Sequence, residues 1–175
     1  MNILETYRLG NPPGLAQRAW IYPSLMVGGG IRDAADAEHL ARDYGIATII
    51  SVESEGVGDL PIIGERWASC YSRFPFQDLK AVGMPDDVIA KVVTFARLRC
   101  VGTGALPAYV HCHLGRSRGP ATAYLILRAV VGQGQAEAMR TMTAALGPHG
   151  NPCWTSHSTF LEGIERWIAR KGIRP

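Results

Sequence analysis

Hydrophobic and polar positions along this chain recur with two different periods, one typical of strands and one typical of helices. Apolar or alternating segments of strand length occur at residues 20–28, 46–52, 71–77 and 106–110. Helical spacing of the apolar positions predicts helices over residues 33–44, 85–99, 121–131, 135–146 and 158–171. In the last of these helices, the expected core residues are Ile164, Trp167 and Ile168. Strands that alternate with helices predict an α/β domain with a central sheet covered by helices.

The segment from His111 to Gly119 joins the strand predicted at 106–110 to the helix that follows it. Backbone N–H groups of a short loop and of a helix's first turn converge on a site that favours an anion. The same partial charge favours a thiolate, so we expect Cys112 to be ionised and nucleophilic. Arg118 can bind two phosphate oxygens with its planar guanidinium, and Gly115 stands where the loop needs a positive φ. The segment predicts a phosphate-binding nucleophile loop, and the less favoured alternative is a buried core cysteine with solvated arginines.

The order His-Cys-x-x-Gly-x-x-Arg, between a strand and a helix, resembles the signature of the cysteine-dependent protein tyrosine phosphatase superfamily, specifically its small dual-specificity branch. The similarity extends to a strand–helix–strand opening over residues 20–52 and to residues 146–151 with Phe160-Leu161 near the end. It covers nearly the whole chain after residue 18. The resemblance implies a mostly parallel sheet in a single phosphatase-like catalytic domain over residues 19–175, preceded by an N-terminal arm of residues 1–18.

The resemblance also implies a catalytic cycle through a cysteinyl phosphate that needs no metal or other cofactor. Cys112 would attack phosphorus, and Arg118 with the loop amides would hold the equatorial oxygens. The phosphate-binding residues would be His113, Leu114, Gly115, Arg116, Ser117 and Arg118. His111 would orient the loop through hydrogen bonds, with acid–base chemistry as its less favoured role.

The family also supplies an aspartic acid that protonates the leaving oxygen and later activates water. Asp78 is the favoured candidate, because it follows the alternating segment at 71–77 and precedes the next predicted helix, as the family order requires. Asp86 and Asp87 fall at the start of that helix, where acidic residues complement the helix dipole. The alternative for Asp78 is a turn residue with a purely structural role.

Two departures from the family pattern affect the predicted function. The family usually has Ser or Thr directly after the arginine, where the hydroxyl eases departure of the cysteine thiolate. Gly119 stands there, and Ser117 cannot be assumed to replace the hydroxyl. We therefore predict slow breakdown of the phosphoenzyme, with a catalytically weak, pseudophosphatase-like phosphate-binding module as the alternative function.

The second departure is the charge of His113 and Arg116, positions that are usually uncharged in members acting on phosphoproteins. Basic residues at these positions are similar to lipid-directed relatives, and extra positive charge favours a multiply anionic substrate. If Arg116 points into solvent, this argument loses its force. Phosphotyrosine, phosphoserine or phosphothreonine proteins and an anionic phospholipid or phosphoinositide both stay open as substrates.

Composition narrows the function classes further. The 175 residues, 47% of them hydrophobic, suit one compact domain, and a net charge of +3 without a basic run argues against nucleic acid as a partner. We expect a soluble cytoplasmic protein, because nothing near the N-terminus has a basic region followed by an apolar core, and no apolar stretch is long enough to cross a bilayer. Four scattered cysteines agree with a reducing compartment. Cys70 and Cys100 are predicted to be free thiols rather than disulfide partners of Cys112, and a redox role for Cys153 is not assigned.

Two other motifs have weaker functional interpretations. Residues 28–33 form a glycine-rich segment after a strand, but Asp33 stands where a dinucleotide-binding loop has its third glycine, so a plain turn is favoured. His149, Cys153 and His157 have a spacing that zinc ligands can use. Asn151-Pro152 breaks any helix that would align them, so we expect no metal site.

Overall fold

The computed structural model describes residues 18–54, 63–64, 67, 69–78, 83–100, 105–146 and 158–173. It contains a five-stranded sheet with the strand order β1-β2-β5-β3-β4. The strands are β1 (Ala19–Tyr22), β2 (Leu25–Gly28), β3 (Thr48–Ser51), β4 (Tyr71–Arg73) and β5 (Ala108–His111). β1 and β2 are antiparallel, whereas the other neighbours pair in parallel. The predicted α/β class with a mostly parallel sheet is confirmed, although the first predicted strand is a hairpin that turns at Pro23 and Ser24.

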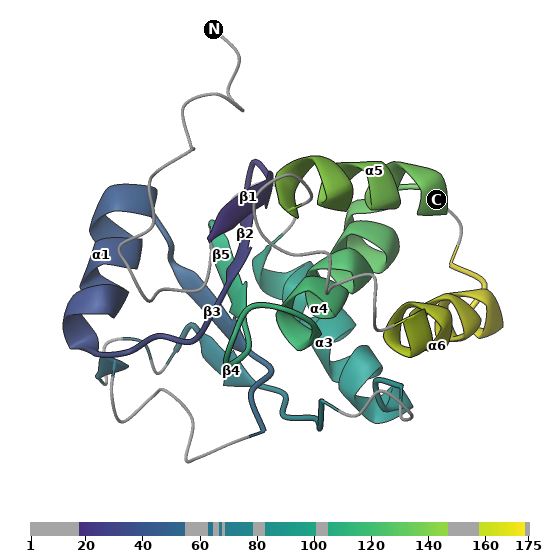
Figure 1. Ribbon diagram of the computed structural model, residues 1–175, viewed down its shortest axis with the longest axis horizontal. Helices are drawn as coiled ribbons and strands as arrows, with labels where there is room; N and C mark the ends of the chain where they lie inside the picture. The colour runs from purple at the N-terminus through teal and green to yellow at the C-terminus, as the bar shows by residue number, and fades with distance from the viewer. Residues whose placement is uncertain are drawn as a thin grey trace, which may run out of the picture.

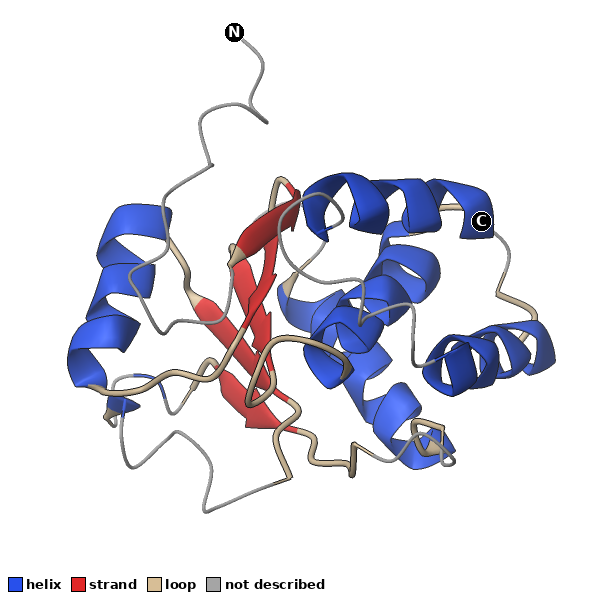
Figure 2. Cartoon of the chain, viewed as in Figure 1, coloured by secondary structure: helices blue, strands red, loops and turns tan. Residues whose placement is uncertain are grey.

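Helices cover both faces of this sheet (Figures 1 and 2). Helix α1 (Ala34–Tyr44) lies on one side, and four other helices lie on the opposite side. These are α3 (Asp86–Arg99), α4 (Arg118–Ile126), α5 (Gln135–Leu146) and α6 (Ser158–Arg170). Their bounds agree with the predicted helices to within a residue, except that α4 begins three residues early and continues into a π-helical turn, Leu127–Val131.

Helix α1 shows how the sequence sets an element's ends. The side chain of Asp33 accepts a hydrogen bond from the backbone N–H of Asp36 and so caps the first turn. Gly45 ends the helix with a φ of 67°, a conformation that favours glycine. These limits agree with the helix predicted over residues 33–44.

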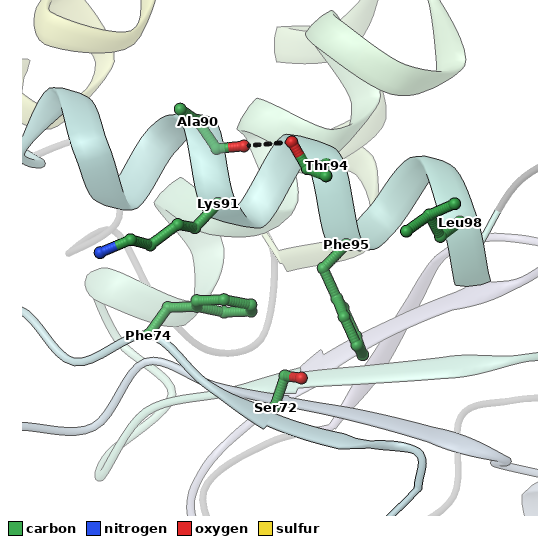
Figure 3. Close-up of a pocket in the computed structure, with 7 residues that line it drawn as sticks. All are labelled: Ser72, Phe74, Ala90, Lys91, Thr94, Phe95 and Leu98. Carbon is green, nitrogen blue, oxygen red and sulfur yellow. Dashed lines mark hydrogen bonds between the residues drawn. The ribbon is translucent and has the colours of Figure 1, made fainter.

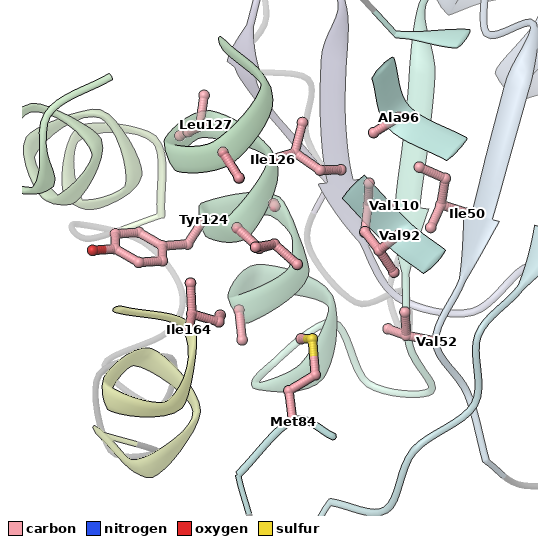
Figure 4. Close-up of a cluster of buried hydrophobic side chains, with 14 of the residues drawn as sticks. Ile50, Val52, Met84, Val92, Ala96, Val110, Tyr124, Ile126, Leu127 and Ile164 are labelled. Carbon is pink, nitrogen blue, oxygen red and sulfur yellow. The ribbon is translucent and has the colours of Figure 1, made fainter. Parts of the chain in front are cut away.

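Side chains of the central strands alternate between two hydrophobic clusters. Tyr109 of β5 packs with the cluster beneath α1, whereas Val110 packs with the larger cluster beneath α3 and α4. Figure 4 shows this larger cluster, in which Val110 and Ile50 of the sheet face Val92 of α3. β5 is therefore buried on both faces, and the loop that follows it starts from a fixed position.

Helix α4 is tied to α6 by a partly buried polar cluster as well as by apolar contacts. Arg128, in the π-helical turn, donates from Nε to Glu165 Oε1 over 2.7 Å and from Nη2 to Oε2 over 2.9 Å. The hydroxyl of Tyr124 donates to the same carboxylate over 2.6 Å. The predicted core positions Ile164, Trp167 and Ile168 are buried beside this cluster, as expected.

The strand predicted over residues 71–77 is shorter than expected. Its last ladder bond runs from the N–H of Phe74 to the carbonyl of Ser51 over 2.8 Å, and Pro75 follows. Phe76 then turns into the core, where its ring meets Phe160 of α6 edge to face with centroids 5.5 Å apart. The prediction is therefore wrong beyond Phe74, because the chain leaves the sheet to enter the helical layer.

Within the described ranges, no helix combines the length and the apolar character that spanning a bilayer requires.

Candidate active site

The His111–Gly119 segment lies at the carboxyl edge of the parallel strands, where ligand sites of open α/β sheets are found. β5 ends at His111, residues 112–117 form the loop, and α4 begins at Arg118. Cys112 is buried, with 2% of its surface exposed. The loop amides and the first turn of α4 thus adjoin Cys112, which is the arrangement that favours an anion.

The loop rests directly on the backbone at the end of β2. Gly115 has a φ of 67°, and a Cβ added there would lie 2.6 Å from the carbonyl carbon of Gly28 and from the nitrogen of Gly29. The N–H of Gly30 donates to the carbonyl of His113 over 3.0 Å. The glycine-rich segment, predicted as a plain turn, therefore also supports the loop by direct backbone contact. The run of three glycines after a strand is a signal for close backbone approach, but the sequence does not show that the approaching residue is Gly115.

Arg118 is held by contacts from two other parts of the chain. The residue is 3% exposed. Its Nη1 donates to Ser54 Oγ over 2.8 Å and to the carbonyl of Phe76 over 3.2 Å, and its Nε lies 3.7 Å from Asp78 Oδ2. The guanidinium is thus oriented before any anion arrives, which reduces the entropic cost of binding one.

Of the three aspartates weighed from the sequence, Asp78 is the one with contacts to this loop. Ser117 Oγ donates to Asp78 Oδ2 over 2.6 Å, and the Asp78 side chain remains 37% exposed. Asp86 accepts from Arg170 of α6 over 2.6 Å. Asp87 accepts from Lys91 over 2.9 Å, and this hydrogen bond lowers the pKa of Asp87. Asp86 and Asp87 therefore pair with basic side chains outside the loop, which gives them a structural role at the start of α3.

His111 is buried beneath the loop and stacks on Tyr109, with ring centroids 5.5 Å apart and an interplanar angle of 14°. The hydroxyl of Tyr109 donates to the carbonyl of Gly29, in the same segment that supports Gly115. Burial raises the pKa of Tyr109, so its phenol stays protonated and remains a donor. His111 is thus linked through Tyr109 to the glycine segment that supports the loop.

Arg18, which the sequence assigned to the N-terminal arm, has a defined place in this support. Its Nη2 donates to both carboxylate oxygens of Asp36 over 2.7 Å, and its guanidinium carbon lies 5.5 Å from the centre of the Tyr109 ring. The Asp36 side chain is only 3% exposed. Sequence reasoning missed this pair, because nothing near Arg18 in the sequence points to Asp36. Residues 1–17 lie outside the described part of the chain.

The two basic positions within the loop have different surroundings. His113 Nδ1 lies 2.8 Å from Glu53 Oε1, while its side chain is 62% exposed. Arg116 and Leu114 are exposed on the loop. Glu53 therefore places a carboxylate beside His113, a contact that the sequence did not indicate.

The strand register separates Cys112 from the other described cysteines. Tyr71 is level with Ile49, and Ile49 is level with Tyr109, so Cys70 lies near the level of Ala108. Cys112 follows Ala108 by four residues, which span about 13 Å along a strand, whereas a disulfide needs a Cα separation below about 7 Å.

Cys100 lies near Ser24 at the amino end of β5, because Ser24 bonds to both Cys100 and Ala108. Burial raises the pKa of Cys100 to about 12. Cys70 and Cys100 are both free thiols, as predicted.

Other candidate sites add little. Among the described residues, no three His, Cys, Asp or Glu side chains are grouped so that they could hold a metal ion. The His149, Cys153 and His157 set lies outside the described residues. An apolar hollow between β4 and α3, lined by Phe74, Phe95 and Leu98 among others, contains no residue of the loop (Figure 3). Its one charged residue, Lys91, is paired with Asp87.

No protein-family model and no curated protein matches this chain. PTPMT1 in complex with PI(5)P superposes with a TM-score of 0.64 at 19% identity, covering 90% of this chain and 99% of that one. Human DUSP28 gives 0.59 at 24% identity, with 93% and 97% covered. The Cydia pomonella PTP-2 phosphatase gives 0.61 at 18% identity, with 81% and 87% covered. These similarities confirm the fold implied by the sequence motif.

Proposed function

We propose that this chain, which has the fold of the dual-specificity phosphatases, is a phosphomonoester hydrolase that works through a cysteinyl-phosphate intermediate. The observation that carries the proposal is the convergence of Cys112, the buried Arg118 and Asp78 on one loop at the carboxyl edge of the sheet. A phosphate-binding loop, a thiol and a carboxyl group are the parts that such a reaction needs.

In the first step, the Cys112 thiolate attacks phosphorus, so that an S–P bond forms and the P–O bond to the leaving group breaks. Asp78 gives its proton to the leaving oxygen. The loop amides and Arg118 stabilise the charge on the equatorial oxygens of a loose transition state. In the second step, Asp78 takes a proton from water, which attacks phosphorus and releases inorganic phosphate and the thiolate.

Gly119 supports the proposal that the second step is slow. A Cβ at this position would lie 3.3 Å from the backbone nitrogen of Cys112, so a serine hydroxyl would stand beside the nucleophile. Glycine provides no such donor to the departing sulfur. The same observation favours the second candidate function, a phosphate-binding module that turns over weakly.

For the substrate, we propose a phosphoprotein or an anionic phospholipid or phosphoinositide in the cytoplasm. Arg116 is exposed, so its charge alone gives little support for a ligand with more than one negative charge. PTPMT1, with the same fold, binds PI(5)P in its structure. The pairing of His113 with Glu53 weakens the argument for a highly charged substrate, and both classes therefore remain part of the proposal.

Rapid mixing with 4-nitrophenyl phosphate tests the reaction. We expect a burst of nitrophenolate stoichiometric with enzyme, followed by slow turnover, and no release from Cys112→Ser. Fast turnover without a burst would contradict the slow second step. No release by the wild-type protein, together with retained binding of orthovanadate, would favour the phosphate-binding module.

A further inference from the structure

Ser117 has an unusual position for a helix N-cap residue. It occupies the N-cap of α4, yet its side chain makes no capping hydrogen bond. Serine at an N-cap ordinarily accepts a hydrogen bond from a backbone N–H of the first turn. Ser117 is 3% exposed, and its hydroxyl instead donates to Asp78 Oδ2 over 2.6 Å. The contact joins residues 39 positions apart in the chain.

The segment that carries Asp78 is held by two consecutive residues, Ser117 and Arg118. Arg118 Nη1 donates to the carbonyl of Phe76, and Ser117 holds Asp78 two residues later. The ring of Phe76 is anchored in the core against Phe160. Without Ser117, the backbone at Phe76 would keep its contacts, but the Asp78 carboxylate would lose a short hydrogen bond.

We propose that Ser117 is a positioning residue, which fixes the Asp78 carboxyl group over the phosphate loop for proton transfer to the leaving group. This inference rests on the proposed function, because it concerns the acid of the same reaction. Ser117 binds Oδ2, so one edge of the carboxyl is directed at the loop while 37% of the side chain stays exposed. A fixed acid contributes most when the leaving oxygen is strongly basic.

The dependence on the leaving group separates positioning from a purely structural role. 4-Nitrophenolate leaves readily without a proton, whereas phenolate is more basic and needs one. We expect Ser117→Ala to lower kcat/KM by roughly tenfold for phenyl phosphate, a part of what a general acid supplies, and by less than about twofold for 4-nitrophenyl phosphate. Ser117→Thr keeps the hydroxyl and should restore most of the phenyl phosphate activity.

Two further variants make the test specific. Ser54→Ala is the matched control, because Ser54 Oγ accepts from Arg118 Nη1 and is expected to affect both esters by the same factor. Asp78→Asn removes the acid, so adding Ser117→Ala to it should cause no further loss with phenyl phosphate. Thermal melts of every variant identify any that fail to fold.

The outcomes distinguish this inference from the proposed function. A loss with Ser117→Ala that is equal for the two esters, or one that persists in the Asp78→Asn background, would overturn the positioning role and leave the hydrolase proposal intact. Wild-type protein that hydrolyses neither ester would contradict the proposed function, and the role of Ser117 with it.

Discussion

Replacing Gly115 by alanine tests whether close contact with the end of β2 keeps the 112–117 loop in shape and able to bind a phosphate-like anion. Gly115 has a φ of 67°, and an added Cβ would lie 2.6 Å from backbone atoms of Gly28 and Gly29. The left-handed conformation alone costs about 1–2 kcal/mol for a residue with a Cβ. Overpacking a tight contact adds about 1–3 kcal/mol. We expect Gly115→Ala to lower the free energy of unfolding by about 2–5 kcal/mol, the sum of these two contributions.

Gly45 provides a matched control, because it has the same φ of 67° and nothing within 4 Å of an added Cβ. Gly45→Ala should therefore cost only the conformational part, about 1–2 kcal/mol. Urea unfolding measures both losses, and titration with orthovanadate measures the affinity for a phosphate-like anion. We expect that affinity to fall about tenfold in Gly115→Ala, the equivalent of one weakened hydrogen bond to a charged group, and to be unchanged in Gly45→Ala.

The reasoning would be refuted if the two substitutions cost the same free energy of unfolding and Gly115→Ala bound vanadate as tightly as the wild-type protein.

Three other predictions follow from the described contacts. Gly119→Ser should place a hydroxyl beside the nucleophile and reduce the burst in rapid mixing, and an unchanged burst would show that the missing hydroxyl does not limit turnover. Burial tends to raise the pKa of Glu165, but hydrogen bonds led by that from Arg128 outweigh it and lower the pKa. Glu165→Gln should therefore cost about 2 kcal/mol at neutral pH. Denaturant unfolding at several pH values measures the difference in free energy of unfolding between the two proteins. This difference should shrink as the pH falls below about 4.3, the pKa of Glu in an unfolded chain, and then through the lower pKa of Glu165 in the folded protein. A difference that stays constant with pH would contradict this prediction. Glu53→Gln, which leaves His113 without its carboxylate, should lower KM more for a water-soluble phosphoinositide than for 4-nitrophenyl phosphate, whereas equal changes would argue against an electrostatic effect.

Helix positions were predictable because their signals are local. Asp33 and Gly45 limit α1 through contacts within a few residues, and apolar spacing alone located α5 and α6. The strand–loop–helix arrangement around Cys112 was predictable because its residue types stand at fixed intervals between a strand and a helix. The early end of β4 has a local signal in Pro75, which has no N–H to donate to a strand ladder. The place of Phe76 against Phe160 has no such signal, because Phe160 is distant in sequence.

The contacts that support the candidate site were less accessible to sequence reasoning. Ser117 was considered only as a substitute for the hydroxyl missing at Gly119, yet it bonds to Asp78. The sequence predicted an ordinary turn at residues 28–30, because the close contact that these glycines make is with Gly115, which is distant in sequence. Pairs of this kind are set by how elements pack, and neither residue carries a distinctive pattern by itself.

The tie between Arg18 and Asp36 sets a limit for shortening this protein at its amino end. A version that starts at residue 19 would leave the Asp36 carboxylate, 3% exposed, with Arg32 as its remaining basic neighbour in the described part of the chain, 3.9 Å away and itself half exposed. Removing one partner of a buried ion pair lowers the free energy of unfolding far more than replacing both partners by apolar residues. It would also take away the cation over the Tyr109 ring, which stacks on His111, the residue next to Cys112. A trimmed expression fragment should therefore begin no later than Arg18.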